Sequence, residues 1–507
     1  MRLNILIGGK AGQGINKVSE IVSQVLAKHG YFTFDYREYP SLIRGGHNFN
    51  VLSISDERVG STESKLDGIV FLDENTLKKH EQNLKKTGFK IGFSDLKQDF
   101  GKNLNIALAG ALICMLGIDK KILIEEVEKT LGKEAAKAAE TGFCGFNPKF
   151  KLPKLNNKVK IMTGSKAIAE GARNSDIDLY LAYPMTPATG VMLELAEKQV
   201  ENKLMVFQPE NEIAVANMAL GASFAGAKTM IGSSGGGFDL MTEALSLQGQ
   251  TEIPLVVYLA SRPGPSTGIP TYTAQADLDV ALKGGHGEFP RIVIAPGDPI
   301  ECIEKTNEAF YLSEKFNCLS IILSDKLLAE SEFSFDNFNN IHKPLKVEVK
   351  RKLPGEAIVK ANSYEHDKYG NTSETAETAK ENAEERLKKY EEIKKQVKNF
   401  EMIKIFGKKE SKNLVIGWGS SKTAILDAIK GLDYKFLQVI YMKPLSDEIK
   451  KHIEAAKKVI IVEQNVTGQL GRLIREKTGI SIKHRILKYD ARPFESDKLK
   501  EEIERVR

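Results

Sequence analysis

The sequence has 507 residues, and at about 150 residues per domain this length corresponds to roughly three domains. Hydrophobic residues make up 41% and charged residues 28%, so the chain is too apolar for a disordered protein. The net charge of +6 is small for this length and no dense basic block is present, which excludes a nucleic-acid-binding protein identified by charge alone.

Apolar stretches and cysteines set two further limits. The longest charge-free apolar stretch, residues 106–118, is shorter than the about 20 residues of a membrane-spanning helix, so we expect a cytoplasmic protein without a membrane partner. The four cysteines lack the spacing of a zinc or iron–sulfur site; they are Cys114, Cys144, Cys302 and Cys318. We therefore expect no metal on this chain and place any iron–sulfur cluster on another subunit.

Four segments differ in pattern along the chain. Residues 1–153 alternate short apolar runs with helical patterns, and residues 154–335 repeat this texture, with strands predicted over 177–182, 229–231, 254–260 and 291–295. Residues 336–409 contain a run of charged helix formers, 374–398, which indicates a solvated or domain-bridging helix. Residues 410–507 return to strand–turn–helix patterns. The sequence predicts an α/β protein with three parallel-sheet domains and a partly helical linker.

The first motif is ILIGGKAGQG, residues 5–14, which predicts a strand, a glycine-rich turn and a helix from Ile15. Glycines at this point let backbone amides approach an anion at the helix N-terminus. The spacing is not that of the dinucleotide-binding fingerprint. A tight turn without a ligand explains the motif equally well.

The second motif is LAYPMTPATG, residues 181–190, which follows a predicted strand. Ligands bind at the carboxyl ends of strands in open parallel sheets, and two prolines hold Thr186 in a rigid turn there. Its hydroxyl would be placed to donate to a ligand oxygen. A proline-rich connection without chemistry fits the same pattern.

The third motif spans residues 207–245, where Glu210 and Glu212 head a helix of small apolar residues. A carboxylate that leads into so apolar a segment is costly unless it has a partner. The glycine run 235–237 then follows the next predicted strand, again at the ligand-binding edge. By themselves, the two glutamates also fit a simple electrostatic preference for a helix N-terminus.

The fourth motif is VVYLASRPGPSTGIPTYTAQADL, residues 256–278. Arg262 leaves a buried strand and enters a loop with three prolines and several hydroxyl side chains, including Ser266, Thr267, Thr271 and Thr273. A guanidinium in a rigid loop suits bidentate recognition of a carboxylate or phosphate. A surface arginine is the ordinary alternative, although the prolines favour a shaped site.

Together these motifs, in this order, resemble the 2-oxoacid:ferredoxin oxidoreductases, specifically an alpha subunit with a gamma domain fused at its N-terminus. GGKAGQG and EYPSLIRGGHN (38–48) resemble the gamma domain, and YPMTP resembles the Tyr-Pro-Ile-Thr-Pro signature. The later matches are RPGPSTGIPTYTAQADL, SYEHDKYG (363–370) and VEQNVTGQLGRLIR (462–475). The resemblance implies a gamma-type domain over 1–153, a pyrimidine-binding thiamine-diphosphate-type domain over 154–335, a linker over 336–409 and a transketolase C-terminal-like domain over 410–507.

The resemblance also implies a chemistry and the residues that carry it. Thiamine diphosphate attacks the keto carbon of a 2-oxoacid, CO2 leaves, two electrons pass to iron–sulfur clusters and coenzyme A takes the acyl group. Glu212 matches the glutamate that hydrogen-bonds the thiamine aminopyrimidine, and Arg262 matches the arginine that binds the substrate carboxylate. Thr186 matches the signature threonine beside substrate and coenzyme A. The resemblance further places Tyr183 and Pro184 at the cofactor and Thr271, Ser266, Thr267 and Tyr272 at the substrate.

Two departures from the family pattern bear on specificity. Met185 replaces isoleucine in the signature, and Tyr272 stands where a basic residue often follows the loop threonine. Because of the second change, the sequence does not determine which side chain the 2-oxoacid substrate carries. By resemblance 2-oxoglutarate is the leading candidate, followed by pyruvate and branched-chain 2-oxoacids.

Two expected signatures are missing from the chain. It has no Gly-Asp-Gly followed by Asn, the magnesium–diphosphate signature, and no cluster cysteines. The resemblance therefore implies a separate beta subunit that carries Mg2+ and a [4Fe-4S] cluster, with ferredoxin as the electron acceptor. The alternatives are a thiamine enzyme that does not use coenzyme A and a non-catalytic scaffold; the retention of Glu212, Arg262 and Thr186 argues against the scaffold.

Overall fold

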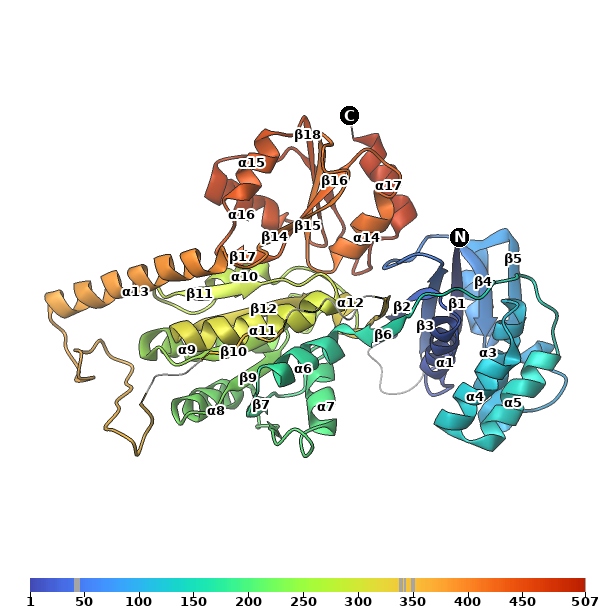
Figure 1. Cartoon of the computed structure of the whole chain (residues 1–507), viewed down its shortest axis with the longest axis horizontal. Helices are drawn as coiled ribbons and strands as arrows, with labels where there is room; N and C mark the ends of the chain where they lie inside the picture. Colours follow the sequence, from blue (N-terminus) through green and yellow to red (C-terminus); the bar gives the residue numbers. More distant parts are fainter. Residues whose placement is uncertain (41–45, 337–340, 342, 348–351, 507) are drawn as a thin grey trace.

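The computed structural model describes residues 1–40, 46–336, 341, 343–347 and 352–506. Helices flank three β-sheets, and the three units follow one another from the N-terminal unit (blue and cyan) through the central one (green and yellow) to the C-terminal one (orange and red) (Figure 1). The predicted α/β class with three sheets is confirmed. In the described ranges, no helix combines the length and apolar character needed to cross a bilayer.

The first sheet has the strand order β5-β4-β1-β3-β2-β13-β6. Its strands are β1 (Arg2–Lys10), β2 (Phe32–Glu38), β3 (His47–Ser55), β4 (Leu66–Phe71), β5 (Leu84–Gly92), β6 (Lys160–Thr163) and β13 (Glu332–Phe335). Its helices are α1 (Ile15–Lys28), α2 (Glu74–His80), α3 (Leu104–Met115), α4 (Lys120–Leu131) and α5 (Lys133–Cys144). Helix α1 begins at Ile15, as the glycine-rich turn predicts.

The first sheet is mixed and not parallel throughout. Strand β1 pairs in parallel with β4, and β4 with β5, but β3 is antiparallel to both β1 and β2. Strands β13 and β6 add two more antiparallel pairings. The predicted parallel arrangement is wrong in this detail, because only the eight residues 39–46 connect β2 to β3, fewer than the about a dozen that a crossover between parallel strands needs.

The second sheet has the order β17-β11-β12-β10-β9-β7-β8 and is parallel apart from the pairing of β11 with β17. Its strands are β7 (Leu179–Leu181), β8 (Met205–Phe207), β9 (Thr229–Ser233), β10 (Leu255–Ser261), β11 (Arg291–Ile294), β12 (Leu319–Asp325) and β17 (Tyr441–Lys443). Its helices are α6 (Gly164–Asn174), α7 (Thr189–Glu197), α8 (Glu212–Phe224), α9 (Gly235–Thr251), α10 (Leu278–Lys283), α11 (Pro299–Phe316) and α12 (Lys326–Glu330).

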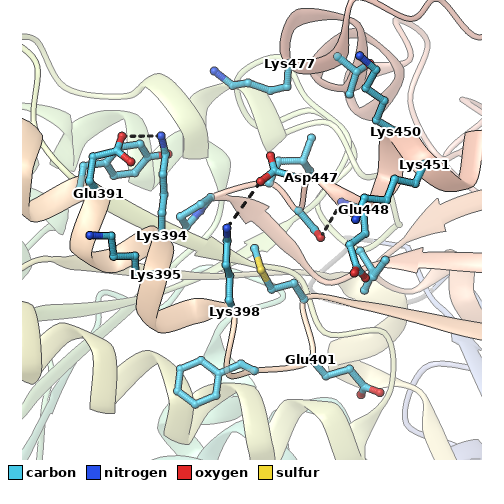
Figure 2. A pocket seen from close by; sticks show the side chains of 18 residues that line it. Glu391, Lys394, Lys395, Lys398, Glu401, Asp447, Glu448, Lys450, Lys451 and Lys477 are labelled. Atoms are coloured by element: carbon cyan, nitrogen blue, oxygen red, sulfur yellow. Dashed lines mark hydrogen bonds and ion pairs between the residues drawn. The ribbon is translucent and has the colours of Figure 1, made fainter.

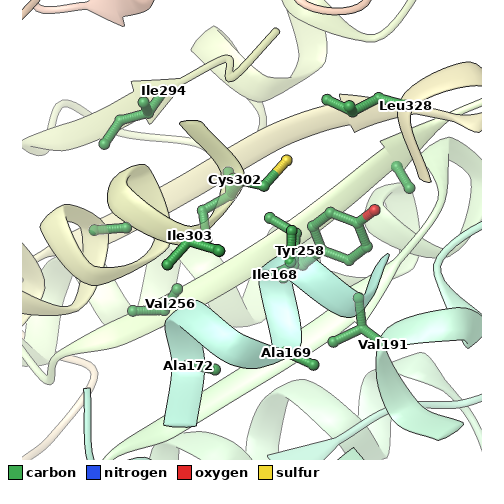
Figure 3. Packing of buried hydrophobic residues seen from close by; sticks show 14 of the residues in the cluster. Ile168, Ala169, Ala172, Val191, Val256, Tyr258, Ile294, Cys302, Ile303 and Leu328 are labelled. Atoms are coloured by element: carbon green, nitrogen blue, oxygen red, sulfur yellow. The ribbon is translucent and has the colours of Figure 1, made fainter. Parts of the chain in front are cut away.

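The core of the second unit lies between this sheet and the helices on its faces. In Figure 3, Ile168 and Ala172 of α6 and Ile303 of α11 lie in one buried cluster with Val256 and Tyr258 of β10. Tyr258 is completely buried, and burial raises the pKa of its hydroxyl well above the ordinary value. An apolar layer of this kind holds the strands in register, so that their carboxyl ends meet at one edge.

The third sheet has the order β14-β16-β15-β18-β19. Its strands are β14 (Ile403–Gly407), β15 (Asn413–Trp418), β16 (Lys435–Val439), β18 (Lys458–Glu463) and β19 (His484–Leu487). Its helices are α14 (Ser421–Ala428), α15 (Glu448–Glu454), α16 (Gln469–Thr478) and α17 (Ser496–Arg505). The 374–398 prediction is confirmed as α13 (Ala376–Val397), a helix that reaches past the second unit and buries only Ile393 and Val397.

Strands and buried charges tie the three units together. The first sheet takes β6 and β13 from within the predicted 154–335 segment, and the second sheet takes β17 from within 410–507. Lys422 of α14 is buried in an ion pair with both Asp298 and Glu301 of the second unit. The first and second sheets thus each contain strands from more than one of the four predicted segments. The division into these segments stays a prediction.

One close helix crossing in the first unit permits a stability prediction. A methyl group on Gly110 of α3 would overlap the backbone carbonyl of Ala139 in α5. We expect Gly110→Ala to destabilise the protein by about 1–3 kcal/mol through overpacking, seen as a lower thermal midpoint. The matched control is Gly145→Ala, because a methyl group there meets no atom nearer than 3.5 Å. Equal midpoints for the two variants would contradict the close crossing.

Candidate functional site

Three neighbouring strands of the second sheet place the candidate site. Strands β7, β9 and β10 are adjacent and parallel, so the loops after Leu181, Ser233 and Ser261 leave the same edge of the sheet. These loops carry the YPMTP motif, the glycine run and Arg262. Open parallel sheets bind ligands at this edge.

Glu212 is the first residue of α8 and is 3% exposed. The helix begins there because Asn211 caps it, its side chain accepting from the Ala214 amide at 2.9 Å. The Oε1 atom of Glu212 has no hydrogen-bond partner among the described residues. A buried carboxylate oxygen without a partner is costly, so this atom is a position for a ligand donor. Glu210, predicted beside it, is exposed.

The glycine run packs directly against this carboxylate. A Cβ on Gly237 would lie 2.5 Å from Glu212 Oε1 and would overlap the Ser233 hydroxyl. Only a glycine leaves space beside the carboxylate at this point. The run begins α9, so its first backbone amides have no acceptor within the helix, and Gly237 lies beside Oε1 of Glu212.

The YPMTP loop lies against the same strand ends. The Ser233 hydroxyl donates to the Met185 sulfur at 3.8 Å, and Arg262 Nη1 donates to the Thr186 carbonyl at 2.8 Å. Burial lowers the pKa of the half-buried Arg262 guanidinium, and the nearby Asp277 carboxylate opposes this shift. The structure thus joins Thr186 directly to Arg262, and Ser233, which contacts Met185, and Glu212 both lie beside Gly237 at the same strand ends. Tyr183 and Pro184 of the same loop are exposed.

The other predicted substrate residues fall into two groups. Ser266 and Thr267 are exposed at the tip of the loop. Thr271 is buried and its hydroxyl donates to the Tyr39 carbonyl of the first unit at 2.6 Å. The Tyr272 ring lies 4.0 Å below the guanidinium of Arg492 from the third unit. In this arrangement Thr271 and Tyr272 hold the loop to its neighbours.

Asp277 is a residue of this site to which the motifs assign no role. A Cβ on Gly235 would lie 2.8 Å from Asp277 Oδ2, an atom that is buried and has no hydrogen-bond partner in the described part of the chain. Burial raises the pKa of this carboxyl to about 6, and the Arg262 charge and the Ser261 hydroxyl oppose the rise. Its position inside the fourth motif, after the loop hydroxyls, is the sequence signal that marks it.

The N-terminal glycine motif forms a turn between β1 and α1. Gly12 and Gly14 have φ of 91° and 76°, values that favour glycine, and Gln13 closes the turn by accepting from the Lys10 amide at 2.6 Å. Residues 41–45 of the EYPSLIRGGHN motif lie outside the described residues. Among the residues that the structure describes, no group of three or more histidine, cysteine, aspartate or glutamate side chains is arranged to hold a metal ion.

Comparison with known proteins identifies the family. Residues 170–402 match the family described as pyruvate flavodoxin/ferredoxin oxidoreductase, thiamine diphosphate-binding, and residues 4–99 match pyruvate ferredoxin/flavodoxin oxidoreductase. The 2-oxoacid:ferredoxin oxidoreductase subunit alpha of Saccharolobus solfataricus is 30% identical over 620 aligned positions, which cover 100% of this chain and 98% of that protein. The chain therefore belongs to the alpha subunits of the 2-oxoacid:ferredoxin oxidoreductases, a family of oxidoreductases, as the motifs predict.

Two further relatives are similar in sequence or fold. The 2-oxoglutarate synthase subunit KorA of Methanocaldococcus jannaschii is 30% identical over 336 positions, covering 62% of this chain and 90% of that subunit. The 2-oxoglutarate:ferredoxin oxidoreductase of Magnetococcus marinus, solved with 2-oxoglutarate, coenzyme A and succinyl-CoA bound, has the same fold. Its TM-score is 0.87 at 24% identity, with 99% of each chain covered.

The raised pKa of Asp277 predicts that ionisation of its carboxyl group lowers the free energy of unfolding. An unfolded aspartate releases its proton near pH 3.8, whereas Asp277 in the folded protein holds it to about pH 6, so folding stability falls as the pH rises between these values. We expect Asp277→Asn to remove this pH-dependent fall in folding stability. At pH values above 6, the thermal midpoint of the variant should exceed that of wild type by the equivalent of about 1–3 kcal/mol. Asp279→Asn, which changes a carboxylate on the exposed face, is the control. A midpoint difference between Asp277→Asn and wild type that stays constant from acid to neutral pH would contradict the assignment.

Proposed function

We propose that this chain, together with a beta subunit, catalyses the coenzyme A-dependent oxidative decarboxylation of a 2-oxoacid to an acyl-CoA and CO2, with reduction of ferredoxin. The observation that carries the proposal is the buried Glu212 carboxylate, whose Oε1 has no partner within the described structure and lies beside Gly237. 2-Oxoglutarate is the proposed substrate. The KorA relatives and the Magnetococcus enzyme, by their names and bound ligands, support this choice.

The residues around Glu212 fit thiamine diphosphate. Its aminopyrimidine presents nitrogen donors to a buried acceptor, and Oε1 of Glu212 is such an acceptor. When bound, this cofactor supplies the nucleophilic carbon and the electron sink that decarboxylation needs. The role of Glu212 is to hold a proton on the ring nitrogen beside it, which requires a carboxyl group because an amide cannot exchange that proton. Tyr183 and Pro184 are proposed to border the cofactor.

Arg262 and Thr186 are proposed to bind the 2-oxoacid. The guanidinium is already positioned by the Thr186 carbonyl through one N–H, which leaves its remaining donors for a carboxylate. A charge-assisted hydrogen bond of this kind contributes about 1.5–3 kcal/mol. Ser266, Thr267, Thr271 and Tyr272 are proposed to line the substrate side of the same loop, with coenzyme A entering beside Thr186.

The remaining parts of the reaction are assigned to other chains. The sequence contains neither a magnesium–diphosphate signature nor cluster cysteines, so we place Mg2+ and the [4Fe-4S] cluster on the beta subunit and ferredoxin downstream of it. We keep the domain division proposed from the sequence, with a gamma-type domain over 1–153, a thiamine-type domain over 154–335, a linker over 336–409 and a transketolase C-terminal-like domain over 410–507. Assembly in the cytoplasm is part of the proposal.

Replacing the proposed proton acceptor tests the mechanism. We expect Glu212→Gln to lower 2-oxoglutarate-dependent, coenzyme A-dependent viologen reduction by at least about a hundredfold, the usual scale for a proton-transfer group. Co-purification with the beta subunit should be unchanged because the two side chains have the same shape. Glu210→Gln changes an exposed neighbour and is expected to leave the rate intact. Near-normal turnover of Glu212→Gln would remove this residue from the mechanism.

Replacing Arg262 tests the proposed substrate contact. We expect Arg262→Ala to raise the KM for every 2-oxoacid by about 10- to 100-fold, which is the loss of one charge-assisted hydrogen bond. Arg262→Lys keeps the charge but not the planar fork, so an intermediate KM is expected. Steady-state kinetics over a panel of 2-oxoacids measures this effect. An unchanged KM in Arg262→Ala would place the carboxylate site elsewhere.

A further inference from the structure

Lys326, the first residue of α12, is a buried lysine that the reaction proposed above does not use. Lysines on the surface of the protein look different. In Figure 2, Lys394 and Lys398 of α13 line a cavity, and 42% and 66% of their side chains are exposed. Only 1% of the Lys326 side chain is exposed. Removing an ammonium group from water is costly, so the contacts that compensate this cost are informative.

The contacts of Lys326 join the second unit to the end of β2 in the first unit. Its ammonium donates to the Arg37 carbonyl, and its Nζ lies 4.9 Å and 5.4 Å from the ring centroids of Tyr36 and Tyr39. Glu330, one turn further along α12, places a carboxylate 3.7 Å from the same Nζ. The buried cation thus holds the last residues of β2 by a backbone carbonyl and two ring faces.

The end of β2 is also an anchor of the Arg262 loop. The Thr271 hydroxyl donates to the Tyr39 carbonyl at 2.6 Å. Glu38 pairs with Arg492 at 2.8 Å, and the Arg492 guanidinium in turn lies 4.0 Å from the centroid of the Tyr272 ring. The segment that Lys326 holds therefore contacts Thr271 directly and Tyr272 through one arginine.

The first turn of α12 contacts the same loop from a second side. Asp325, the N-cap residue of α12, accepts from the Thr273 hydroxyl at 3.4 Å. The Leu327 amide donates to that hydroxyl at 3.2 Å. Lys326 lies between these two residues in the sequence. The turn that carries Lys326 thus fixes the loop at Thr273 and, through the end of β2, at Thr271.

Hydrogen bonds inside the loop connect this anchored end to Arg262. The Tyr272 amide donates to the Ile269 carbonyl at 3.2 Å, and the Ile269 amide donates to the Pro263 carbonyl at 3.0 Å. The loop closes tightly here, since a Cβ on Gly268 would lie 1.8 Å from the Pro263 carbonyl oxygen. Pro263 follows Arg262 in the chain, so two backbone hydrogen bonds join the anchored residues to the neighbour of the guanidinium-bearing residue.

We propose that Lys326 is a positioning residue for Arg262, which acts through the end of β2 and Thr271 to fix the loop that presents the guanidinium to the carboxylate of the 2-oxoacid. The inference rests on the proposed role of Arg262 in substrate binding. Lys326 itself touches neither substrate nor cofactor, so its loss should weaken substrate binding and leave the chemical step nearly unchanged. A loop that is fixed before the ligand arrives loses less conformational entropy on binding.

Lys326→Met tests the proposal, because methionine keeps an aliphatic stem in the buried space and removes the ammonium. The variant is purified together with the beta subunit. We expect backbone hydrogen exchange of residues 263–273, read by mass spectrometry, to become about tenfold faster. The KM for 2-oxoglutarate should rise by about 5- to 10-fold, while kcat changes by less than about twofold. Thr271→Val, which removes the hydroxyl at the next contact, should produce the same two effects.

Lys305→Met is the matched control for the loss of a buried lysine. Lys305 of α11 is 2% exposed and pairs with Glu308 of the same helix at 2.7 Å. Its replacement should lower the thermal midpoint and leave both the loop exchange and the KM at their wild-type values. Loop exchange in Lys326→Met that is no faster than in Lys305→Met overturns the proposal. Wild-type exchange and KM in Thr271→Val also overturn it, even where Lys326→Met does not fold.

A double variant separates this inference from the proposed role of Arg262. Adding Lys326→Met to Arg262→Ala should not raise the KM further, because the loop then has no guanidinium to position. Effects on the KM that multiply overturn the positioning role. An unchanged KM in Arg262→Ala would instead overturn the substrate contact of Arg262, and faster loop exchange in Lys326→Met would still show that Lys326 holds the loop.

Discussion

A buried carboxylate with one open hydrogen-bonding position is the constraint on which the rest of the site depends. Glu212 is held there because Asn211 caps the helix that it begins, and because the second sheet buries that helix along an apolar face. This arrangement requires a glycine at residue 237, since a Cβ there would lie 2.5 Å from Oε1 of Glu212. Local capping, sheet packing and one glycine thus keep this acceptor buried and unpaired. A hydrogen bond from a ligand donor to an acceptor in such surroundings is stronger than one made in water.

The loop that carries Arg262 takes its shape from all three units of the chain. Thr271 donates to the Tyr39 carbonyl in the first unit. Gln275 exchanges hydrogen bonds with Gln464 and also donates to the Trp418 carbonyl in the third unit. A loop held from both sides has little conformational freedom left to lose, so the surrounding units fix the shape of the loop that carries Arg262. The family relationship explains the presence of these units, and their contacts explain how they act.

Much of the local structure and the central residues of the site are predictable from the sequence. The start of α1 at Ile15 follows from the glycine turn, and α13 follows from its charged helix formers. The motifs also indicate Thr186, Glu212 and Arg262, which the structure places at one edge of the second sheet. The mixed pairing of the first sheet was not predictable, because β13 pairs with β2 across some three hundred residues and a strand pattern does not name its partner. Asp277 was missed for a related reason, since its burial against Gly235 is decided by packing and not by spacing.

The sequence by itself determined the family, the class of fold and the residue types that the chemistry needs, because these reside in short motifs whose order along the chain is specific. The tertiary structure decided which polar atoms remain unpaired. Glu212 Oε1 beside Gly237 and Asp277 Oδ2 beside Gly235 are buried without hydrogen-bond partners in the described structure, and neither condition is written in a local pattern. Burial and pairing of a side chain depend on residues that are distant in the sequence and adjacent only in the folded chain. Both change the energy of a charged group far more than the residues next to it in the sequence do.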